Sequence, residues 1–137
     1  MKLAADANVL LSVVLGGRAG LIATHRKIEG IFTTHQTFAE VEEYAPLLSR
    51  KRRLPLDNVL LAVTALPVSI VGREVYSRSI GRATRLMGRR DPDDVGLLAL
   101  ALHLKIPVWS NDDDFRVTGV EWYTTAQLLR TLGVGQL

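Results

Sequence analysis

The stretch Lys2–Leu11, K-L-A-A-D-A-N-V-L-L, indicates the fold class most clearly, because an apolar run ends there at an acid and a helical pattern begins. Residues 2–5 predict a first strand, and residues 7–15 predict a helix that a pair of glycines ends. Asp6 stands at the junction, where aspartate is a frequent helix N-cap. The stretch therefore predicts a strand that leads directly into a helix, which is the building unit of a parallel α/β sheet.

The same alternation of short apolar strands and helical segments continues to the end of the chain. Further strands are predicted at residues 30–33, 67–71, 107–110 and 120–124. Helical segments are predicted at residues 19–27, 37–44, 46–53, 56–66, 73–87, 92–105 and 125–132. We expect the 67–71 strand to be central, and Asp91 to cap the helix that Pro92 opens. Without an internal repeat or linker, these elements predict one α/β domain over residues 1–137 with a mostly parallel sheet.

Composition limits the chemistry that the chain can perform. Its 137 residues are 47% hydrophobic, which is enough for a single domain with a core. The absence of cysteine excludes disulfides and thiolate-bound zinc but leaves a metal with oxygen ligands. The net charge of +3 permits nucleic-acid binding without requiring it. No apolar run reaches the roughly 18 residues of a membrane span, and no signal peptide is recognisable, so a cytoplasmic protein without membrane contact is expected.

Carboxylates stand at or near the other strand-to-helix junctions as well. The candidates are Asp6, Glu40, Asp94, Asp112 and Asp114. Each has an ordinary local explanation, since acids cap helices, complement helix N-termini and populate turns. In a parallel sheet, however, every strand-to-helix junction lies at the carboxyl edge, where ligands bind. We therefore expect Asp6, Asp94 and Asp112 to converge there, with Glu40 joining them if its helix crosses that edge.

Such a convergence of carboxylates predicts a metal site. Three or four carboxylates in one cleft raise each other's pKa and do not all stay ionised unaided. A divalent cation resolves the repulsion, and oxygen ligands favour Mg²⁺ or Mn²⁺, which activate water and polarise phosphate in phosphodiester cleavage. Glu43 shares a helical face with Glu40 and is an open alternative to it. The run Asp112–Asp114 holds one acid more than a turn explains, and the ranking of Asp112 and Asp114 is open.

The order and spacing of four motifs resemble PIN-domain ribonucleases, including toxins of the VapC type. The motifs are D-A-N-V-L-L-S from Asp6, T-F-A-E-V around Glu40, D-P-D-D-V-G-L-L-A-L-A-L around Asp94, and S-N-D-D-D-F from Ser110. The resemblance spans essentially the whole chain. It implies a three-layer α/β/α fold and Mg²⁺- or Mn²⁺-dependent cleavage of RNA. It places the candidate catalytic acids of the family at Asp6, Glu40, Asp94 and Asp112.

The resemblance also implies metal ligands, supporting residues and partners. The implied ligands are Asp6, Asp94, Asp112 and Asp114, and the polar positions beside the metal are Asn8 and Ser110. Proteins of this kind form homodimers, and the toxins pair with a small antitoxin encoded beside them. The main alternative is a non-catalytic PIN module that binds RNA or a protein partner. A phosphate-accepting receiver domain fits poorly, because no acceptor aspartate follows the predicted 67–71 strand.

Arginines recur along one side of the predicted helix over residues 73–87 and just beyond it. The stripe consists of Arg78, Arg82, Arg85 and Arg89, and the opposite, core-facing stripe consists of Tyr76, Ile80, Ala83 and Met87. A solvated face is the ordinary explanation of such a stripe. Arginine also suits phosphate contacts, so the stripe is a candidate surface for RNA or an acidic antitoxin segment. The basic run at residues 50–53 is a second candidate.

Overall fold

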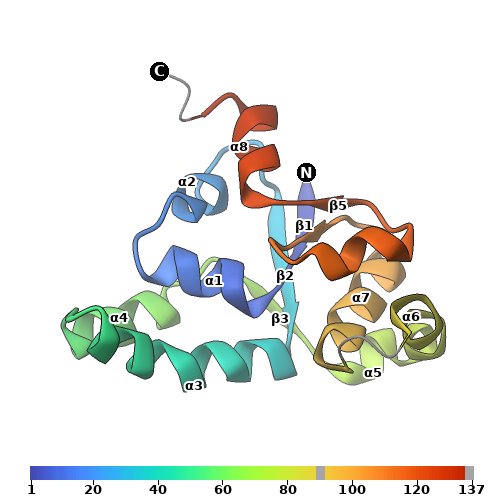
Figure 1. The fold of residues 1–137 in the computed structure, drawn as a ribbon, viewed down its shortest axis with the longest axis horizontal. Helices are drawn as coiled ribbons and strands as arrows, with labels where there is room; N and C mark the ends of the chain where they lie inside the picture. The colour runs from blue at the N-terminus through green and yellow to red at the C-terminus, as the bar shows by residue number, and fades with distance from the viewer. Residues whose placement is uncertain (89–91, 135–137) are drawn as a thin grey trace.

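The computed structural model describes residues 1–88 and 92–134, and a five-stranded sheet lies at its centre (Figure 1). The strands are β1 (Lys2–Ala5), β2 (Gly30–Thr34), β3 (Ser69–Val71), β4 (Val108–Trp109) and β5 (Trp122–Tyr123). Their order across the sheet is β3-β2-β1-β4-β5, and each of the described neighbouring pairs runs parallel. The predicted parallel α/β class is therefore confirmed.

Helices cover both faces of this sheet. The helices before β3 are α1 (Ala7–Val14), α2 (Ala19–Ala23), α3 (His35–Lys51) and α4 (Leu56–Thr64). The later ones are α5 (Arg73–Tyr76), α6 (Ile80–Met87), α7 (Pro92–Leu104) and α8 (Thr125–Leu132), with the 3₁₀ segments η1 (Ser77–Ser79) and η2 (Asp113–Thr118). Figure 1 shows α1, α3 and α4 on one side of the strands and α5, α6 and α7 on the other. The layers are thus α/β/α, and the described residues hold no helix with the length and apolarity of a membrane span.

Alternation along the central strands creates two cores, one on each face of the sheet. Leu3 and Ala5 of β1 belong to the buried cluster formed with α1, α2, α3, α4 and α8, while Ala4 between them belongs to the cluster formed with α5, α6 and α7. In β4, Trp109 joins the first cluster and Val108 the second. All five side chains are fully buried. This two-residue period is the one expected of a strand that is covered on both faces.

The strand predicted at residues 67–71 is real but is not central. It is the shorter β3, which among the described strands pairs only with β2 and therefore forms an edge of the sheet. Ile70 is exposed, and the apolar character of the segment does not reflect burial on both faces. Pro67 is the feature of the sequence that favours an edge position. Proline has no N–H to donate to a second neighbouring strand and is therefore found mainly in edge strands.

Two helix predictions were wrong about continuity. The segments predicted at 37–44 and 46–53 form the single helix α3, which continues through Pro46 because its buried face, including Val41 and Ala45, packs as one surface. The predicted helix over 73–87 is divided into α5, η1 and α6. The Ser77 hydroxyl donates to the carbonyl of Glu74 at 3.3 Å, a local bond of the kind that competes with regular helix. Asp91, the predicted cap of α7, lies outside the described residues.

The start of α8 offers a direct test of local stability. The Thr124 hydroxyl oxygen accepts from the backbone N–H of Gln127 at 3.2 Å, and the Gln127 side chain accepts from the backbone N–H of Thr124 at 2.9 Å. Replacing Thr124 with alanine is expected to lower the free energy of unfolding by about 1 kcal/mol in urea titrations, because an orphan N–H loses its partner. Thr131→Ala, in the last turn of the same helix, is the control. An equal loss in Thr131→Ala would show that capping is not the cause.

Candidate metal centre

The reversal of strand order between β1 and β4 positions the candidate site. The chain adds β2 and β3 on one side of β1, then returns to add β4 and β5 on the other side. In open parallel sheets such a reversal opens a crevice at the carboxyl edge. Asp6 directly follows β1 and Ser110 directly follows β4, so both residues stand at this edge of the sheet. The backbone N–H of Asp6 donates to the carbonyl of Trp109 at 3.2 Å, which ties the two strand ends together.

Hydrogen bonds connect Asp6 with the loop after β4. Asp6 is only 7% exposed, and its Oδ1 accepts from the N–H of Val9 at 3.0 Å, so it does cap α1. Its Oδ2 accepts from the hydroxyl of Ser110. The same Ser110 oxygen accepts from the backbone N–H of Asp112 at 3.0 Å. Asp6 therefore has two roles: Oδ1 caps α1, and Oδ2 connects Asp6 with the loop that carries Asp112.

The electrostatic surroundings of Asp6 favour the neutral form of its carboxyl group. Burial raises the pKa of the Asp6 carboxyl, and the hydrogen bonds from Ser110 and Val9 lower it by less. The negative charge of Asp112 raises the pKa further, which shows that the two carboxylates interact. A cation beside Asp6 would favour the ionised form of its carboxyl group.

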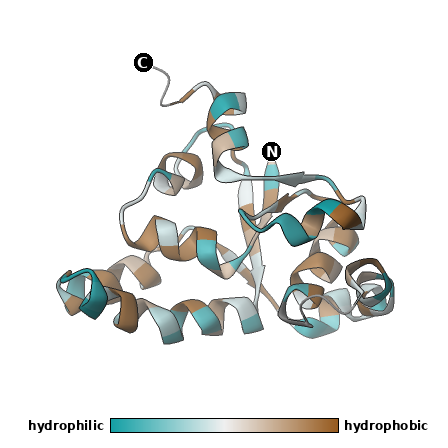
Figure 2. Cartoon of the chain, viewed as in Figure 1, coloured by the Kyte–Doolittle hydropathy of each residue, from teal (hydrophilic) through white to brown (hydrophobic). Residues whose placement is uncertain are grey.

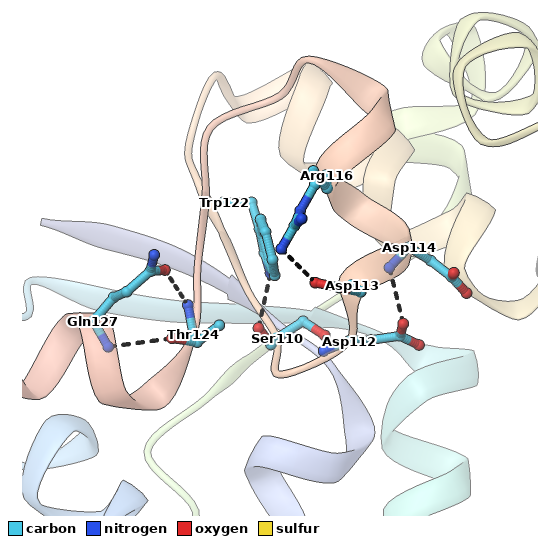
Figure 3. A network of polar contacts seen from close by, with 8 residues as sticks. All are labelled: Ser110, Asp112, Asp113, Asp114, Arg116, Trp122, Thr124 and Gln127. Carbon is cyan, nitrogen blue, oxygen red and sulfur yellow. Dashed lines mark hydrogen bonds and ion pairs between the residues drawn. The ribbon is translucent and has the colours of Figure 1, made fainter.

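Three carboxylates meet beside this hydrogen-bonded loop. Asp94, Asp112 and Asp114 each bring one carboxylate oxygen within 4.8 Å of the other two. Asp94 lies near the N-terminus of α7, and the other two lie at the start of η2, where Oδ1 of Asp112 accepts from the N–H of Asp114 at 2.9 Å (Figure 3). Oxygen ligands of Mg²⁺ stand about 2.1 Å from the ion, and hence about 3 to 4 Å from one another. The three half-buried acids therefore fit an ion of this class.

Asp113 is the one acid of the run Asp112–Asp114 that does not belong to the three-carboxylate group. Its carboxylate lies 3.0 Å from a guanidinium nitrogen of Arg116, and both side chains are largely exposed. Figure 3 shows Asp113 turned toward Arg116 and away from the carboxylates of Asp112 and Asp114. The strict alternation that a strand would impose is absent here, because the 3₁₀ segment η2 begins directly after Asp112. The two flanking acids join the cluster and the middle one does not.

Asp6 and Glu40 lie outside the three-carboxylate group among the described residues. Asp6 is connected to it through Ser110, as above. Glu40 is half-buried on α3, a helix that contacts both α1 and α7, whereas Glu43 is exposed. Of the two alternatives on this helix, Glu40 is therefore the one on the inner side.

The other predicted polar position, Asn8, does not join the acids. Its side chain is exposed on α1 and lines a cavity of about 220 Å³ together with Ser12 and Arg52. None of the candidate acids lines that cavity. The backbone N–H of Asn8 does contribute, because it helps to lower the pKa of Asp6.

Two tryptophans form hydrogen bonds at the strand ends beside the site, a role that was not predicted from the sequence. Trp109 is fully buried, and its indole N–H donates to the Thr125 hydroxyl at 3.0 Å. Trp122 is half-buried, and its indole N–H donates to the carbonyl of Ser110 at 2.8 Å (Figure 3). The positioning role of Trp122 was missed because it depends on the pairing of β4 with β5 and not on any local spacing.

The predicted arginine stripe is divided by the break in its helix. Arg78 lies in η1, while Arg82 and Arg85 lie in α6, and all three are exposed. Arg89 lies outside the described residues. Arg82 lines a cavity together with Lys105. Lys105 follows the C-terminal end of α7, whereas Asp94 lies near the N-terminal end of that helix. The basic run at residues 50–53 is exposed at the end of α3, where Figure 2 shows a concentration of hydrophilic residues.

Solved structures share this fold. The protein PAE2754 from Pyrobaculum aerophilum has a TM-score of 0.65 at 15% sequence identity, and the match covers 96% of this chain and 88% of that one. VapC20 from Mycobacterium tuberculosis, described as a sarcin-ricin loop cleaving toxin, has a TM-score of 0.57 at 16% identity, with coverage of 88% and 96%. Identities this low demonstrate similarity of fold. No curated protein sequence matches this chain significantly.

A family profile gives the classification. The profile of the PIN domain matches residues 5–133, from the last residue of β1 to the residue after α8. This range contains Asp6 and the three-carboxylate group, so the match and the geometry concern the same part of the molecule. The chain belongs to the PIN domain family.

Proposed function

We propose that this protein is a Mg²⁺- or Mn²⁺-dependent endoribonuclease that hydrolyses RNA phosphodiester bonds, and that it is the toxin of a toxin–antitoxin pair. The observation that carries the proposal is the group of Asp94, Asp112 and Asp114 at the point where the strand order reverses. Membership of the PIN domain family supports a nuclease. The structural similarity to VapC20, whose description names it a toxin that cleaves the sarcin-ricin loop, supports RNA as substrate and the toxin role.

Each acid has a proposed role in this site. Asp94, Asp112 and Asp114 hold the divalent ion, which supplies Lewis acidity to a phosphate oxygen and lowers the pKa of an attacking water. Asp6 is the further proposed ligand, and through the Ser110 hydroxyl it also orients the loop that carries Asp112. Glu40, on the inner side of α3, orients the water or completes the ligand set. Asn8 supports this edge through its backbone N–H.

Cleavage of a labelled RNA by the purified, chelator-treated chain tests the proposal. We expect internal cuts when Mn²⁺ or Mg²⁺ is added and intact RNA when EDTA is present. Binding of the RNA without any cut, at saturating Mn²⁺, would favour the alternative of a non-catalytic PIN module. Equal cleavage with and without EDTA would contradict the metal-dependent mechanism.

The exposed residues Arg78, Arg82 and Arg85 form the proposed contact surface for RNA or an antitoxin, and Arg89, the fourth predicted member, lies outside the described residues. Replacing Arg85 with glutamine is expected to weaken RNA binding and to reduce by about 1 the slope of log affinity against log salt, because one phosphate contact is lost. Fluorescence anisotropy at several salt concentrations measures this slope. Arg130→Gln, an exposed arginine on α8, serves as the control. Identical slopes for parent and Arg85→Gln would remove this residue from the RNA surface.

The proposed partners are a small acidic antitoxin and a second copy of this chain. The exposed basic run at residues 50–53 offers a complementary surface for acidic antitoxin segments. Co-expression with the neighbouring gene tests the toxin role in cells. We expect growth arrest that the neighbour relieves and that Asp6→Ala abolishes. Arrest that persists with Asp6→Ala would separate the arrest from the nuclease site.

A further inference from the structure

A cavity of about 290 Å³ opens between α3, α5, α6 and α7. Gln36 of α3, Arg73 and Tyr76 of α5, and Val95 and Gly96 of α7 contribute to its lining. None of the candidate acids lines it, so it is distinct from the metal centre described above. A volume of this size is at the small end of ligand sites in proteins.

Two helices connect the cavity with the candidate acids. Gly96 follows Asp94 by two residues on α7, which corresponds to about 3 Å along the helix axis. Gln36 precedes Glu40 by four residues on α3, so these two side chains lie on the same face of that helix. The helices α3 and α7 contact each other. The cavity and two of the candidate acids, Glu40 and Asp94, therefore share the helices α3 and α7, with Gln36 and Glu40 on one face of α3.

The walls of the cavity combine apolar surface with a few polar groups. Tyr76 is only 5% exposed, and Ile80 and Val95 add further apolar surface. The amide of Gln36 both donates and accepts hydrogen bonds, and Arg73 is an exposed cation. Arg73 is close enough to Tyr76 to lower the pKa of its phenol, although burial raises that pKa by more. A cavity of this composition suits a flat group with apolar faces and polar edges. Arg73 suits an anion attached to that group.

Gly96 lines the cavity close to polar atoms of Tyr76 and Gln36. A Cβ atom at this position would lie 3.8 Å from the Tyr76 hydroxyl and 3.9 Å from Oε1 of Gln36, which are ordinary contact distances. A methyl group there would therefore be tolerated by the protein while it occupied space in the cavity. Glycine inside a helix lowers helix stability relative to alanine, so the absence of a side chain here is not explained by the needs of the helix.

We propose that this cavity binds one nucleobase of the RNA substrate next to the cleaved phosphate and thereby sets a base preference. Proteins recognise single-stranded RNA by bonding to base edges with side-chain amides and by stacking bases on aromatic or arginine side chains. Gln36 reads the base edge, Arg73 contacts the adjoining phosphate, and Tyr76 with Val95 packs against the base. The inference rests on the proposed ribonuclease function, because it assumes RNA at the neighbouring acids.

The test measures nucleotide binding by amide chemical shifts in the presence of EDTA, with each of the four nucleoside 5′-monophosphates as the probe. For the parent we expect saturable shifts at Gln36, Tyr76 and Gly96, with affinities that differ among the bases. In Gly96→Ala we expect affinity to fall about 10-fold or more, since one added methyl group in a binding pocket has this effect. The matched control is Gly20→Ala, on helix α2, where an added Cβ meets nothing within 4 Å.

The outcomes separate this inference from the proposed function. RNA cleavage with the same base preference in parent, Gly96→Ala and Gln36→Leu would overturn the base site and leave the ribonuclease intact. Nucleotide shifts at the cavity in a chain that never cleaves RNA would overturn the ribonuclease and retain a nucleotide site. Shifts that avoid Gln36, Tyr76 and Gly96, or equal affinity in parent and Gly96→Ala, would overturn the inference directly.

Discussion

Replacing Asp94 with asparagine is expected to reduce Mn²⁺-dependent RNA cleavage about 1000-fold. Asparagine keeps the shape of the side chain but removes one of the three charges that lie within 4.8 Å of one another. Loss of metal-dependent stabilisation of the transition state costs roughly 4 kcal/mol, and each 1.36 kcal/mol is a factor of ten in rate. Single-turnover cleavage at saturating Mn²⁺ measures the effect. The fold should persist in circular dichroism, because the substitution also relieves repulsion with Asp112 and Asp114.

Asp113→Asn is the matched control for this prediction. It makes the same chemical change in the same acidic region, but Asp113 is exposed and is paired with Arg116 at the surface. Exposed ion pairs of this kind contribute little to stability, so the variant should cleave RNA at the parent rate. Parent-like cleavage by Asp94→Asn would show that the carboxylate cluster does not act in the reaction. Equal losses in both variants would point to the overall negative charge of this edge and not to a defined site.

Mn²⁺ is expected to stabilise the folded chain strongly. A ligand that binds only the folded state at 100 times its Kd raises the free energy of unfolding by about 2.7 kcal/mol, which corresponds to roughly 10 °C in Tm for a domain of this size. Thermal unfolding with increasing Mn²⁺ measures the shift. Asp112→Asn should lose most of it, while Asp113→Asn should retain it. A parent Tm that does not respond to Mn²⁺ would contradict a metal centre built from these acids.

The same measurement should depend on pH in a defined direction. Burial raises the pKa of Asp6 in the folded chain, so the folded state holds this proton more tightly than the unfolded state. The free energy of unfolding without metal should therefore fall as the pH rises from the unfolded pKa of Asp6 through its folded pKa, and level off above it. Metal binding requires the ionised carboxylate, so stabilisation by Mn²⁺ should grow over the same interval. A Mn²⁺ effect that is constant over this interval would exclude Asp6 from the site.

Much of the fold follows from local pattern. The strand-to-helix junction at Asp6 and the helix after Pro92 lie within a residue or two of their predicted places, because apolar periodicity and capping act over a few residues. The place of β3 at the edge could not be predicted in this way, since strand order depends on tertiary pairing. Continuity through Pro46 and the division at 77–79 likewise depend on packing and on side-chain bonds that propensity does not report.

The sequence predicted that some of the candidate acids would meet, but it did not predict the geometry of the group. Asp94 and Asp112 were expected to meet because parallel junctions share one edge, and the structure brings them together with Asp114. Asp113 stays outside the carboxylate group because of the turn of η2 and the position of Arg116. Neither can be predicted from the spacing of residues in the sequence. The cavity at Gly96 also lay beyond sequence reasoning, because its walls come from four helices.

The most direct test of a metal centre at the carboxyl edge between β1 and β4 is a crystal of this protein grown with Mn²⁺ and measured near the manganese absorption edge. We expect an anomalous peak about 2.1 to 2.2 Å from carboxylate oxygens of Asp94, Asp112 and Asp114, beside the Asp6–Ser110 hydrogen bond. No peak at this edge at saturating Mn²⁺, or a peak bound only elsewhere on the molecule, would contradict a metal centre there.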